Sequence, residues 1–377
     1  MADFYEFFAG GGMARAGLGP DWTCRFANDF DPKKAASYAT NWGKDHLKIG
    51  DIAQLTLRDL PGHADLAWAS FPCQDLSHAG SRAGLQGERS GTFWAFWHLM
   101  QGLASARRAP RIIVLENVYG LISSTEGRDF AALGKAFTEL GYRFGAVVID
   151  AVHFVPQSRP RLFVIAVAPG VNLPAQVIRN DPGALWHPRK LVDAKFMLPA
   201  AVQDNWIWWN IPAPATREIG FADLIEDIPT GVQWHSHEET QALLGMMSLV
   251  NREKVRAARR TGERHVGALY RRTRNGIQRA EVRFDDVAGC LRTPGGGSSR
   301  QSILVVEGQR IRSRLLSPRE AARLMGLPDQ YVLPEKYNDA YRLMGDGLVV
   351  PVISHITQHI ISPISQMTEV APNEDAA

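Results

Sequence analysis

The chain has 377 residues, 45% of them hydrophobic, and a formal net charge of +3. This composition excludes a disordered or fibrous protein, and the length predicts one large domain and a smaller one. No segment approaches the roughly 20 continuous apolar residues that span a bilayer, and no N-terminal stretch has the pattern of a signal peptide. We therefore expect a cytoplasmic protein with no membrane partner.

Six apolar runs alternate with helical patterns in the first half of the chain, which is typical of a doubly wound α/β sheet. The predicted strands are Phe4–Phe8, Thr23–Asn28, Ala64–Ser70, Arg111–Leu115, Ala146–Ala151 and Arg161–Val167. Three helices are predicted between them. Asp31 and Pro32 form the N-cap and first turn of one, residues 92–108 form a longer one, and Gly141 ends another.

The alternation fails after about Pro169, and prolines, tryptophans and arginines follow without a clear period until about Arg312. We predict a second, irregular domain there, with Trp206, Trp208 and Trp209 in its core. Helical order returns at Ser317–Glu320, which reads as a capping box, and Val349–Ile361 is expected to be a helix or a strand–helix pair. Residues 371–377 are predicted to be a flexible tail.

Three features at successive strand ends indicate a nucleoside site. A glycine turn, Gly10-Gly11-Gly12, follows the first strand and lets the backbone approach a ligand. Asp29 offers a carboxylate for ribose hydroxyls, Phe30 an aromatic face for a purine, and Asp51 an acceptor for an adenine amino group. The turn lacks the glycine spacing of dinucleotide-binding proteins. These features favour S-adenosylmethionine over NAD.

Candidate catalytic groups lie at neighbouring strand ends. Cys73 follows a predicted strand and a proline, which is typical of a nucleophile more than of a core thiol. Glu116 ends the next apolar strand, where a carboxyl group could donate a proton. Arg159 and Arg161 alternate in an extended segment, and two guanidinium groups on one face suit a phosphate or an anionic transition state. Cys24, Cys73 and Cys290 match no zinc cluster, so we predict no metal site.

Positive charge is concentrated in one segment. Between Arg252 and Arg283 the net charge is +8, so the rest of the chain carries −5. The alternative to a binding surface is a solvated helix face. This asymmetry nevertheless indicates a polyanion that binds one region of the protein.

The order of these motifs resembles that of the bacterial DNA cytosine-5 methyltransferases, the modification enzymes of restriction systems. The resemblance covers nearly everything except the middle segment. The matching motifs are the glycine loop around Phe8, Gly10 and Gly12; Pro72-Cys73-Gln74 with Ser77; Glu116-Asn117-Val118; Gln157-x-Arg159-x-Arg161; Arg314–Glu320 with Gly326 and Pro328; and Gly345-Asp346-Gly347 before Val350–Val352.

The resemblance implies a Rossmann-like, S-adenosylmethionine-dependent methyltransferase sheet with a smaller, irregular target recognition domain. Residues 1–168 and 313–370 would form the catalytic and cofactor-binding domain, and residues 169–312 the target recognition domain. By this resemblance Cys73 adds to C6 of a flipped-out cytosine in double-stranded DNA, Glu116 protonates N3, and Arg159 and Arg161 brace the base and its phosphate. Methyl transfer to C5 would leave S-adenosylhomocysteine, and Gln157 and Asn117 are predicted to complete the catalytic site.

The family pattern also predicts the remaining binding residues. For the cofactor they are Phe8, Ala9, Gly10, Gly11, Gly12, Met13, Asp29, Phe30, Asp51, Ile52, Pro72, Phe93, Asp346, Gly347 and Leu348. For DNA they are Gln74, Ser77, Arg271, Arg272, Arg274, Arg292, Gly295, Gly296 and Arg300. The chain departs from the pattern at Glu6, Met13 and Asp346. Asp346 stands where asparagine is usual and is expected to change cofactor affinity modestly.

Three other functions fit the sequence less well. A transfer-RNA cytosine methyltransferase would share the catalytic motifs, but its Cys-Phe-Thr signature is absent and the basic insertion favours duplex DNA. A DNA-binding regulator on an inactive methyltransferase fold would have lost Cys73, Glu116 or Arg161. A nicotinamide oxidoreductase conflicts with the glycine spacing. We expect a bacterial or phage-encoded enzyme that acts as a monomer, with a cognate restriction endonuclease as a possible partner.

Overall fold

The computed structural model describes residues 1–72, 91–274, 276–293 and 300–367. The chain forms two compact units. The first comprises Met1–Ile149, Pro160–Pro214 and Val350–Ala377, and the second comprises Asp150–Arg159 and Ala215–Val349. These units differ from the predicted domains, because residues 169–214 pack with the first unit and residues 313–349 with the second. The functional division into catalytic and recognition domains stays a prediction.

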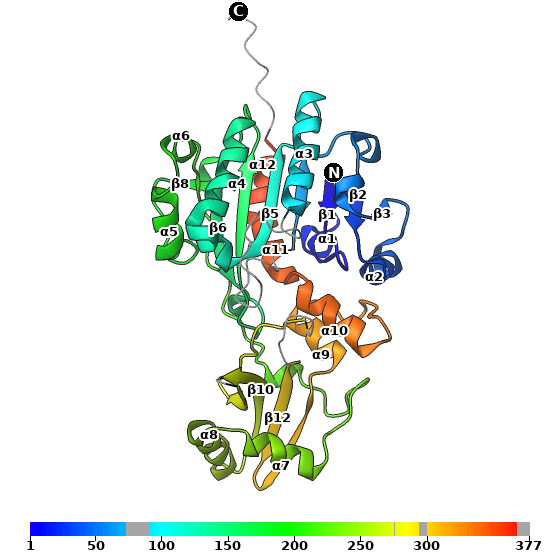
Figure 1. Cartoon of the computed structure of the whole chain (residues 1–377), viewed down its shortest axis with the longest axis vertical. Helices are drawn as coiled ribbons and strands as arrows, with labels where there is room; N and C mark the ends of the chain where they lie inside the picture. Colours follow the sequence, from blue (N-terminus) through cyan, green and yellow to red (C-terminus); the bar gives the residue numbers. More distant parts are fainter. Residues whose placement is uncertain (73–90, 275, 294–299, 368–377) are drawn as a thin grey trace, which may run out of the picture. The chain divides into compact units, whose positions relative to one another are not determined.

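The first unit is built on a seven-stranded sheet with the strand order β3-β2-β1-β4-β5-β7-β6 (Figure 1). The strands are β1 Ala2–Phe7, β2 Trp22–Asp29, β3 Leu47–Ile49, β4 Leu66–Ala69, β5 Ile112–Val118, β6 Arg143–Asp150 and β7 Pro160–Val167. The pairs from β3 through β5 are parallel, whereas β7 runs antiparallel to β5. All six predicted strands are confirmed, and the short β3 was not predicted.

The predicted helices of the first unit are also confirmed. They are α2 Pro32–Trp42, α3 Thr92–Ser105 and α4 Arg128–Glu139, and a short α1 Met13–Leu18 follows β1. The Asp31 side chain accepts a hydrogen bond from the backbone N–H of Lys33 at 2.9 Å and so caps α2. Gly141 has a φ of 75° just beyond α4, in the left-handed region that favours glycine.

An apolar core fills the space between the sheet and the helices α3 and α4, which lie in front of the strands in Figure 1. Phe7 and Leu115 of the strands, Phe96 and Met100 of α3, and Phe137 of α4 belong to this core and are at most 1% exposed. Parallel strands are covered on both faces, which explains their continuous apolar sequences. The edge where these strands end is therefore held by a rigid core.

The C-terminal segment of the first unit is helical, as predicted. It comprises α11 Val350–Ile356, a π-helical turn Thr357–Ile361 and α12 Ser362–Ser365. Helix α11 packs against α1 so closely that a Cβ on Gly17 would lie 2.3 Å from Ile353 Cβ. By length and composition the helical stretch Tyr337–Ser365 could cross a membrane, but Gly347 and the residues after it interrupt it and 56% of its apolar window is buried. We assign it to the protein core.

Residues 169–214 add α5 Arg189–Phe196, α6 Ala200–Gln203 and the short strands β8 Ile178–Arg179 and β9 Trp208–Trp209 to the first unit. Trp209 is fully buried there, and the ring of Trp206 lies 5.3 Å from that of Phe144. The prediction that these tryptophans form the core of a separate domain is therefore wrong. The segment shows no helical period because its apolar side chains, which pack into the first unit, belong to short turns and short elements.

The second unit contains a four-stranded antiparallel sheet with the strand order β11-β10-β12-β13. Its elements are α7 His237–Gly245, α8 Leu249–Arg260, β10 Arg264–Arg274, β11 Ile277–Arg283, β12 Ser302–Glu307, β13 Arg310–Leu315, α9 Pro318–Leu324 and α10 Tyr337–Asp346. Leu243, Val255, Leu269, Val282 and Leu304 form its core with α7 and α8. The prediction of an irregular region missed this sheet.

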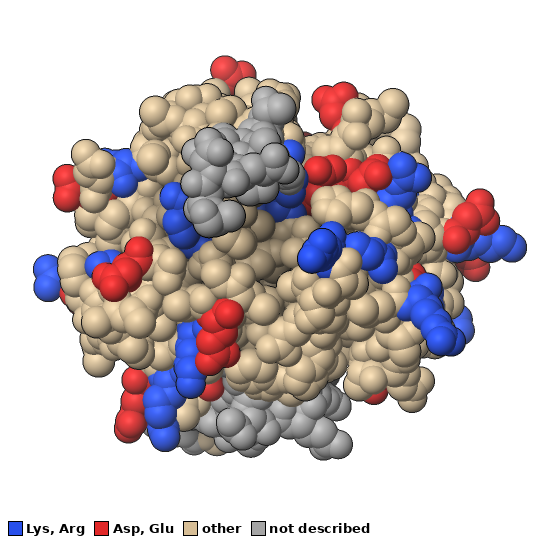
Figure 2. All heavy atoms as spheres, turned by 90° about the horizontal axis from the view of Figure 1, so that it is seen from above, with Lys and Arg blue, Asp and Glu red and all other residues tan. Residues whose placement is uncertain are grey.

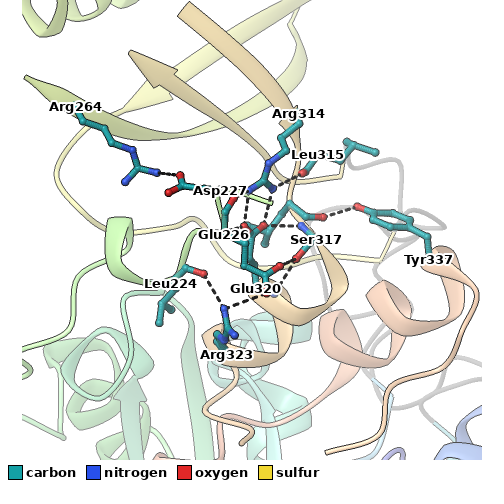
Figure 3. Close-up of polar contacts among 11 residues, drawn as sticks. Leu224, Glu226, Asp227, Arg264, Arg314, Leu315, Ser317, Glu320, Arg323 and Tyr337 are labelled. Carbon is teal, nitrogen blue, oxygen red and sulfur yellow. Dashed lines mark hydrogen bonds and ion pairs between the residues drawn. The ribbon is translucent and has the colours of Figure 1, made fainter. Parts of the chain in front are cut away.

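The predicted capping box at the start of α9 is confirmed and belongs to a buried polar network (Figure 3). Arg314 donates to both carboxylate oxygens of Glu320, at 2.7 and 2.6 Å, and both side chains are fully buried. Glu320 also accepts from the backbone N–H of Ser317 at 2.7 Å and of Glu226 at 2.8 Å. Every oxygen of this buried carboxylate therefore has partners, as burial of a charge requires.

Candidate active site

A glycine turn follows β1 and has an unusual backbone. Phe8, Gly10 and Gly12 have φ angles of 58°, 55° and 76°, all in the left-handed region. The backbone N–H of Ala9 donates to the carbonyl of Asn28 at 2.9 Å, which connects the turn to the end of β2. A Cβ on Gly10 would have no atom of the described residues within 4 Å. One side of the turn is therefore open among the described residues, and its contact with a ligand stays a prediction.

The carboxylates predicted to bind the nucleoside already bond to the backbone. Asp29 is 6% exposed and accepts from the N–H of Gly10 at 2.8 Å and of Asp31 at 2.9 Å. Burial raises the pKa of Asp29 above its ordinary value, against the opposing effect of Lys34. Asp51 accepts from the N–H of Ala53 at 2.9 Å. Each carboxylate has further lone pairs, so these bonds leave room for a ligand hydroxyl or amino group.

The apolar residues predicted for the cofactor differ in exposure. Phe30 is 70% exposed, whereas Ile52 is 3% exposed and Met13 2%. Phe93 is fully buried: its ring stacks on Trp97 with a centroid distance of 6.0 Å and contacts Phe71 at 5.5 Å. In this structure Phe93 therefore packs in the core of the first unit. That Phe93 contacts the cofactor stays a prediction.

An open pocket of about 450 Å³ lies between the segment Ile52–Leu57 and helix α3. Leu55, Leu57, Trp94 and Leu99 make its lining largely apolar, and Thr56 and His98 add polar groups. Ile52 contributes to the same lining. The predicted base-contacting residue Ile52 is thus next to available space.

Glu116 and Arg161 meet at the end of β5. The Arg161 Nε and Glu116 Oε1 atoms are 3.2 Å apart, and the two side chains are 18% and 10% exposed. They lie on adjacent strands, because β7 runs antiparallel to β5 with Val118 opposite Arg161. The sequence predicted that both would belong to one site but gave no indication that they pair. The pair places a carboxyl group and a guanidinium group side by side at the sheet edge.

Asn117 connects this edge to the chain after β4. Its Nδ2 donates to the carbonyl of Phe71 at 3.3 Å, and its Oδ1 accepts from the N–H of Val118 at 2.9 Å. Phe71 is followed by Pro72, and then by Cys73, which lies outside the described residues together with Gln74, Ser77, Gly295 and Gly296. The described segment that contains β4 thus ends at Pro72, next to β5 and one residue before the predicted nucleophile.

Gln157 and Arg159 are buried in the second unit and bond mainly to backbone groups. Arg159 is 2% exposed and donates to the carbonyls of Leu291 at 2.9 Å, and of Gly345 and Gly347 at 2.8 Å each. Gln157 is fully buried and donates to the carbonyl of Leu324 at 2.8 Å. Arg159 and Arg161 therefore have different surroundings, whereas the sequence predicted that both would face one anion.

The predicted DNA-binding arginines are described in part. Arg271, Arg272 and Arg292 are exposed, and the guanidinium of Arg272 lies 4.8 Å from the ring centroid of Tyr270. Arg300 donates to Asn338 Oδ1 at 2.6 Å. Arg274 ends β10, and its side chain is not described. Figure 2 shows a face of the molecule on which basic and acidic side chains are interspersed.

The model of the C-5 cytosine-specific DNA methylase family matches residues 2–362. The chain belongs to this family. The type II methyltransferase M.MspI of Moraxella sp. is 25% identical over 378 residues, which cover 99% of this chain and 73% of M.MspI. M.HhaI of Haemophilus parahaemolyticus is 25% identical over 366 residues, which cover 96% of this chain and 95% of M.HhaI.

A crystal structure of the Dnmt2 methyltransferase of S. pombe superposes on this methylase with a TM-score of 0.60. The superposition covers 97% of this chain and 99% of that chain at 17% identity, so it bears on the fold alone. Together with the family match, it confirms the α/β fold of an S-adenosylmethionine-dependent methyltransferase. The methylase is a DNA (cytosine-5-)-methyltransferase, and the family implies S-adenosylmethionine as its methyl donor.

Sequence reasoning missed two groups of this methylase that support the predicted site. Asp150 accepts from the backbone N–H of Arg159 at 2.7 Å and from the Ser158 hydroxyl at 3.2 Å, so it fixes the segment before β7. The indole N–H of Trp42 donates to the carbonyl of Gly11 at 3.0 Å. Trp42 is distant in sequence from the glycine turn, and Asp150 lies outside the motif that begins at Gln157. No spacing rule therefore identifies either residue.

Proposed function

We propose that this methylase transfers a methyl group to C5 of a flipped-out cytosine in a specific double-stranded DNA sequence, through a covalent bond between Cys73 and C6. The Glu116–Arg161 pair is the observation that carries the proposal, because it brings a proton-donating group and a cation to one sheet edge. The bond from Asn117 to Phe71 supports it, since the chain leading to Cys73 starts at the same edge.

The residues have distinct roles in the proposed cycle. The Cys73 thiolate adds to C6 while the Glu116 carboxyl protonates N3, which converts the ring to an enamine that is nucleophilic at C5. Arg161 braces Glu116 and the base. After methylation, loss of the C5 proton and expulsion of the Cys73 thiolate restore the aromatic ring. Extrusion of the base from the duplex costs a few kcal/mol, which contacts with the protein must offset.

S-adenosylmethionine supplies the methyl group when it is bound. The glycine turn fits such a ligand, because Gly10 is open on one side and Phe30 is 70% exposed. Asp29 would bind the ribose and Asp51 the adenine, each with lone pairs that the backbone bonds do not occupy. Asp346, at the end of α10, would lie near the amino-acid part, and we predict that Asp346→Asn changes the dissociation constant modestly.

The relatives named type II methyltransferases support a role in restriction and modification, with a cognate endonuclease in the same system. We propose a bacterial or phage-encoded, cytoplasmic enzyme that acts as a monomer, because each cycle concerns a single cytosine. The second unit would supply the DNA contacts through the exposed arginines of the β10–β11 hairpin.

The decisive test measures the transfer of labelled methyl groups to DNA and to RNA by the parent and by Cys73→Ser. The parent is expected to label DNA and not RNA, and the variant to label neither. Equal incorporation by both proteins would exclude the Cys73 mechanism, and labelling of RNA alone would exclude the proposed substrate. Base-resolution methylation sequencing of an expressing host then identifies the target sequence.

A further inference from the structure

Helix α2 is connected to the glycine turn at both of its ends. At its N-terminus the Asp29 carboxylate accepts from the N–H of Gly10 at 2.8 Å and from that of Asp31, the N-cap residue, at 2.9 Å. At its C-terminus the indole Nε1 of Trp42 donates to the carbonyl of Gly11 at 3.0 Å. Two consecutive residues of the turn are thus bonded to the two flanks of one helix.

The Trp42 ring also determines the space around Gly12. A Cβ on Gly12 would lie 2.4 Å from Trp42 Nε1 and 3.0 Å from Tyr38 Cε2, far inside van der Waals contact. Gly12 has a φ of 76°, so its backbone too requires glycine. By contrast, a Cβ on Gly10, two residues earlier, would have no atom within 4 Å in the part of the chain that the structure describes. The turn is therefore in tight contact with α2 on one side and open on the other.

The indole ring is itself held in place. The guanidinium of Arg15 on α1 lies 5.1 Å from the ring centroid of Trp42, and its Nη1 donates to the Tyr38 hydroxyl at 3.3 Å. Tyr38 is fully buried and its hydroxyl is 3.1 Å from Nε2 of His46. A ring restrained in this way can orient the Gly11 peptide with little loss of side-chain entropy on ligand binding.

We propose that Trp42 is a positioning residue for the cofactor: its indole N–H fixes the Gly11 peptide so that the open side of the turn is already ordered when S-adenosylmethionine binds. This inference rests on the proposed function of the turn. Trp42 acts through the Gly11 carbonyl and need not touch the cofactor. Loss of its N–H should therefore weaken cofactor binding and leave DNA binding and the chemical step unchanged.

The test uses the full chain and Trp42→Phe, which keeps an aromatic ring and removes the donor. Titration calorimetry with S-adenosylhomocysteine, in the absence of DNA, should show a dissociation constant raised about 3- to 10-fold, the range expected for one hydrogen bond. In steady state the KM for S-adenosylmethionine should rise by a similar factor, with kcat and the KM for DNA within about twofold of the parent. A purely structural role would not separate these constants.

Trp22→Phe is the matched control. Trp22 is 5% exposed, and its Nε1 donates to Ser362 at 3.5 Å, at the opposite end of β2 from the turn. This variant should bind S-adenosylhomocysteine like the parent. An unchanged dissociation constant in Trp42→Phe, or an equal increase in both variants, would overturn the proposal.

A second replacement covers the case that Trp42→Phe does not fold. Benzothienylalanine at position 42 has sulfur in place of the indole N–H and keeps the ring shape, and it should raise the same dissociation constant. Parent-like binding by this protein would overturn the role of Trp42. If the parent itself failed to bind S-adenosylhomocysteine, the proposed function would fail first, and the two failures are thereby distinguishable.

Discussion

At the scale of single residues, Glu116 is held in place by a contact of its own side chain and by a contact of the next residue. Its Oε1 lies 3.2 Å from Arg161 Nε, and the next residue, Asn117, bonds to the carbonyl of Phe71. The side chain keeps 10% of its surface exposed, so it is accessible to a base while held by its neighbour. This combination suits a group that must transfer one proton to a bound ring and recover it.

Glu116→Gln should abolish most of the methyl transfer. The amide keeps the volume of the carboxyl group and can still accept a hydrogen bond from Arg161. It has no acidic proton to transfer to N3. We expect kcat to fall by about 10²- to 10⁴-fold, the usual contribution of a positioned acid–base group, with little change in thermal stability. Single-turnover methylation of DNA measures the effect.

Glu126→Gln provides the comparison in the same unit. Glu126 is 90% exposed and lies 3.9 Å from Arg128, so its removal should leave kcat unchanged. Equal rates for Glu116→Gln and the parent would contradict the assigned role of Glu116.

Glu6 predicts a pH dependence of stability. It is 1% exposed at the end of β1, and burial raises its pKa from the ordinary value of 4.5 to about 8, against the lowering effect of Arg15. The unfolded chain therefore loses this proton at lower pH than the folded chain. The parent should lose stability as the pH rises from about 4.5 to 8 and show no further loss from this group above that range.

The comparison of the parent with Glu6→Gln isolates this effect. The variant cannot ionise at this position, so its free energy of unfolding should improve relative to the parent from pH 5 to pH 8. Urea denaturation at several pH values measures the difference. Parallel pH profiles for the two proteins would show that Glu6 does not retain a proton in the folded state.

Spacing in the sequence did not predict what the candidate site residues contact. Arg159 and Arg161 alternate and were expected to face the same anion, yet Arg159 bonds to the carbonyls of Leu291, Gly345 and Gly347 and Arg161 pairs with Glu116. Those carbonyls lie more than 100 residues away in the chain. Local periodicity contains no information on such partners.

At the scale of elements, α9 shows how a local signal and a distant contact combine. Ser317, Pro318 and Glu320 gave the capping box that the sequence predicted, and the box is present. The sequence did not reveal that Arg314, at the end of β13, would be fully buried against the same Glu320. Strand β13, with arginines at 310, 312 and 314, therefore has the sequence of a charged, exposed strand, although Arg314 lies in the interior.

Local sequence patterns also did not identify the sheet of the second unit. Strand β10 shows no alternation of apolar and polar residues, because the mostly apolar run at residues 266–270 is followed directly by Arg271 and Arg272. Strand β12 is almost entirely buried and so shows no alternation at all. In the first unit, by contrast, strands covered on both faces gave continuous apolar runs, and all six that were predicted are present.

Arg314→Met should strongly destabilise the second unit. The variant leaves the Glu320 carboxylate buried without its cation, which costs about 3 to 5 kcal/mol for pairs of this kind. Arg256→Met removes an exposed arginine that lies 3.4 Å from Glu253 and should cost less than about 1 kcal/mol. Urea unfolding of both variants measures the contrast, and similar small losses would show that the buried pair contributes little.

At the scale of the whole molecule, the uneven distribution of charge destabilises part of the fold. The segment from Arg252 to Arg283 carries +8, and the rest of the chain carries −5. On the β10–β11 hairpin, Arg272 lies directly opposite Arg279, and both are exposed. Like charges in opposite positions of antiparallel strands destabilise the pair. Their presence is accounted for if a polyanion binds there.

Arg272→Gln should therefore affect binding and stability in opposite directions. Removing one of two facing cations relieves repulsion, so thermal stability should be equal to that of the parent or slightly higher. Loss of one phosphate contact should weaken binding to duplex DNA and reduce the slope of log affinity against log salt by about 1. Fluorescence anisotropy of a labelled duplex at several salt concentrations measures the affinity and the slope, and thermal unfolding measures the stability.

Arg189→Gln is the control for this prediction. Arg189 is 89% exposed in the first unit and lies 2.7 Å from Asp193, so its replacement changes the net charge by the same amount at a different place. If DNA binding depended on total charge alone, the two variants would lose affinity equally. A loss confined to Arg272→Gln would assign the contact to the hairpin, because only a cation near the phosphates releases counterions when DNA binds.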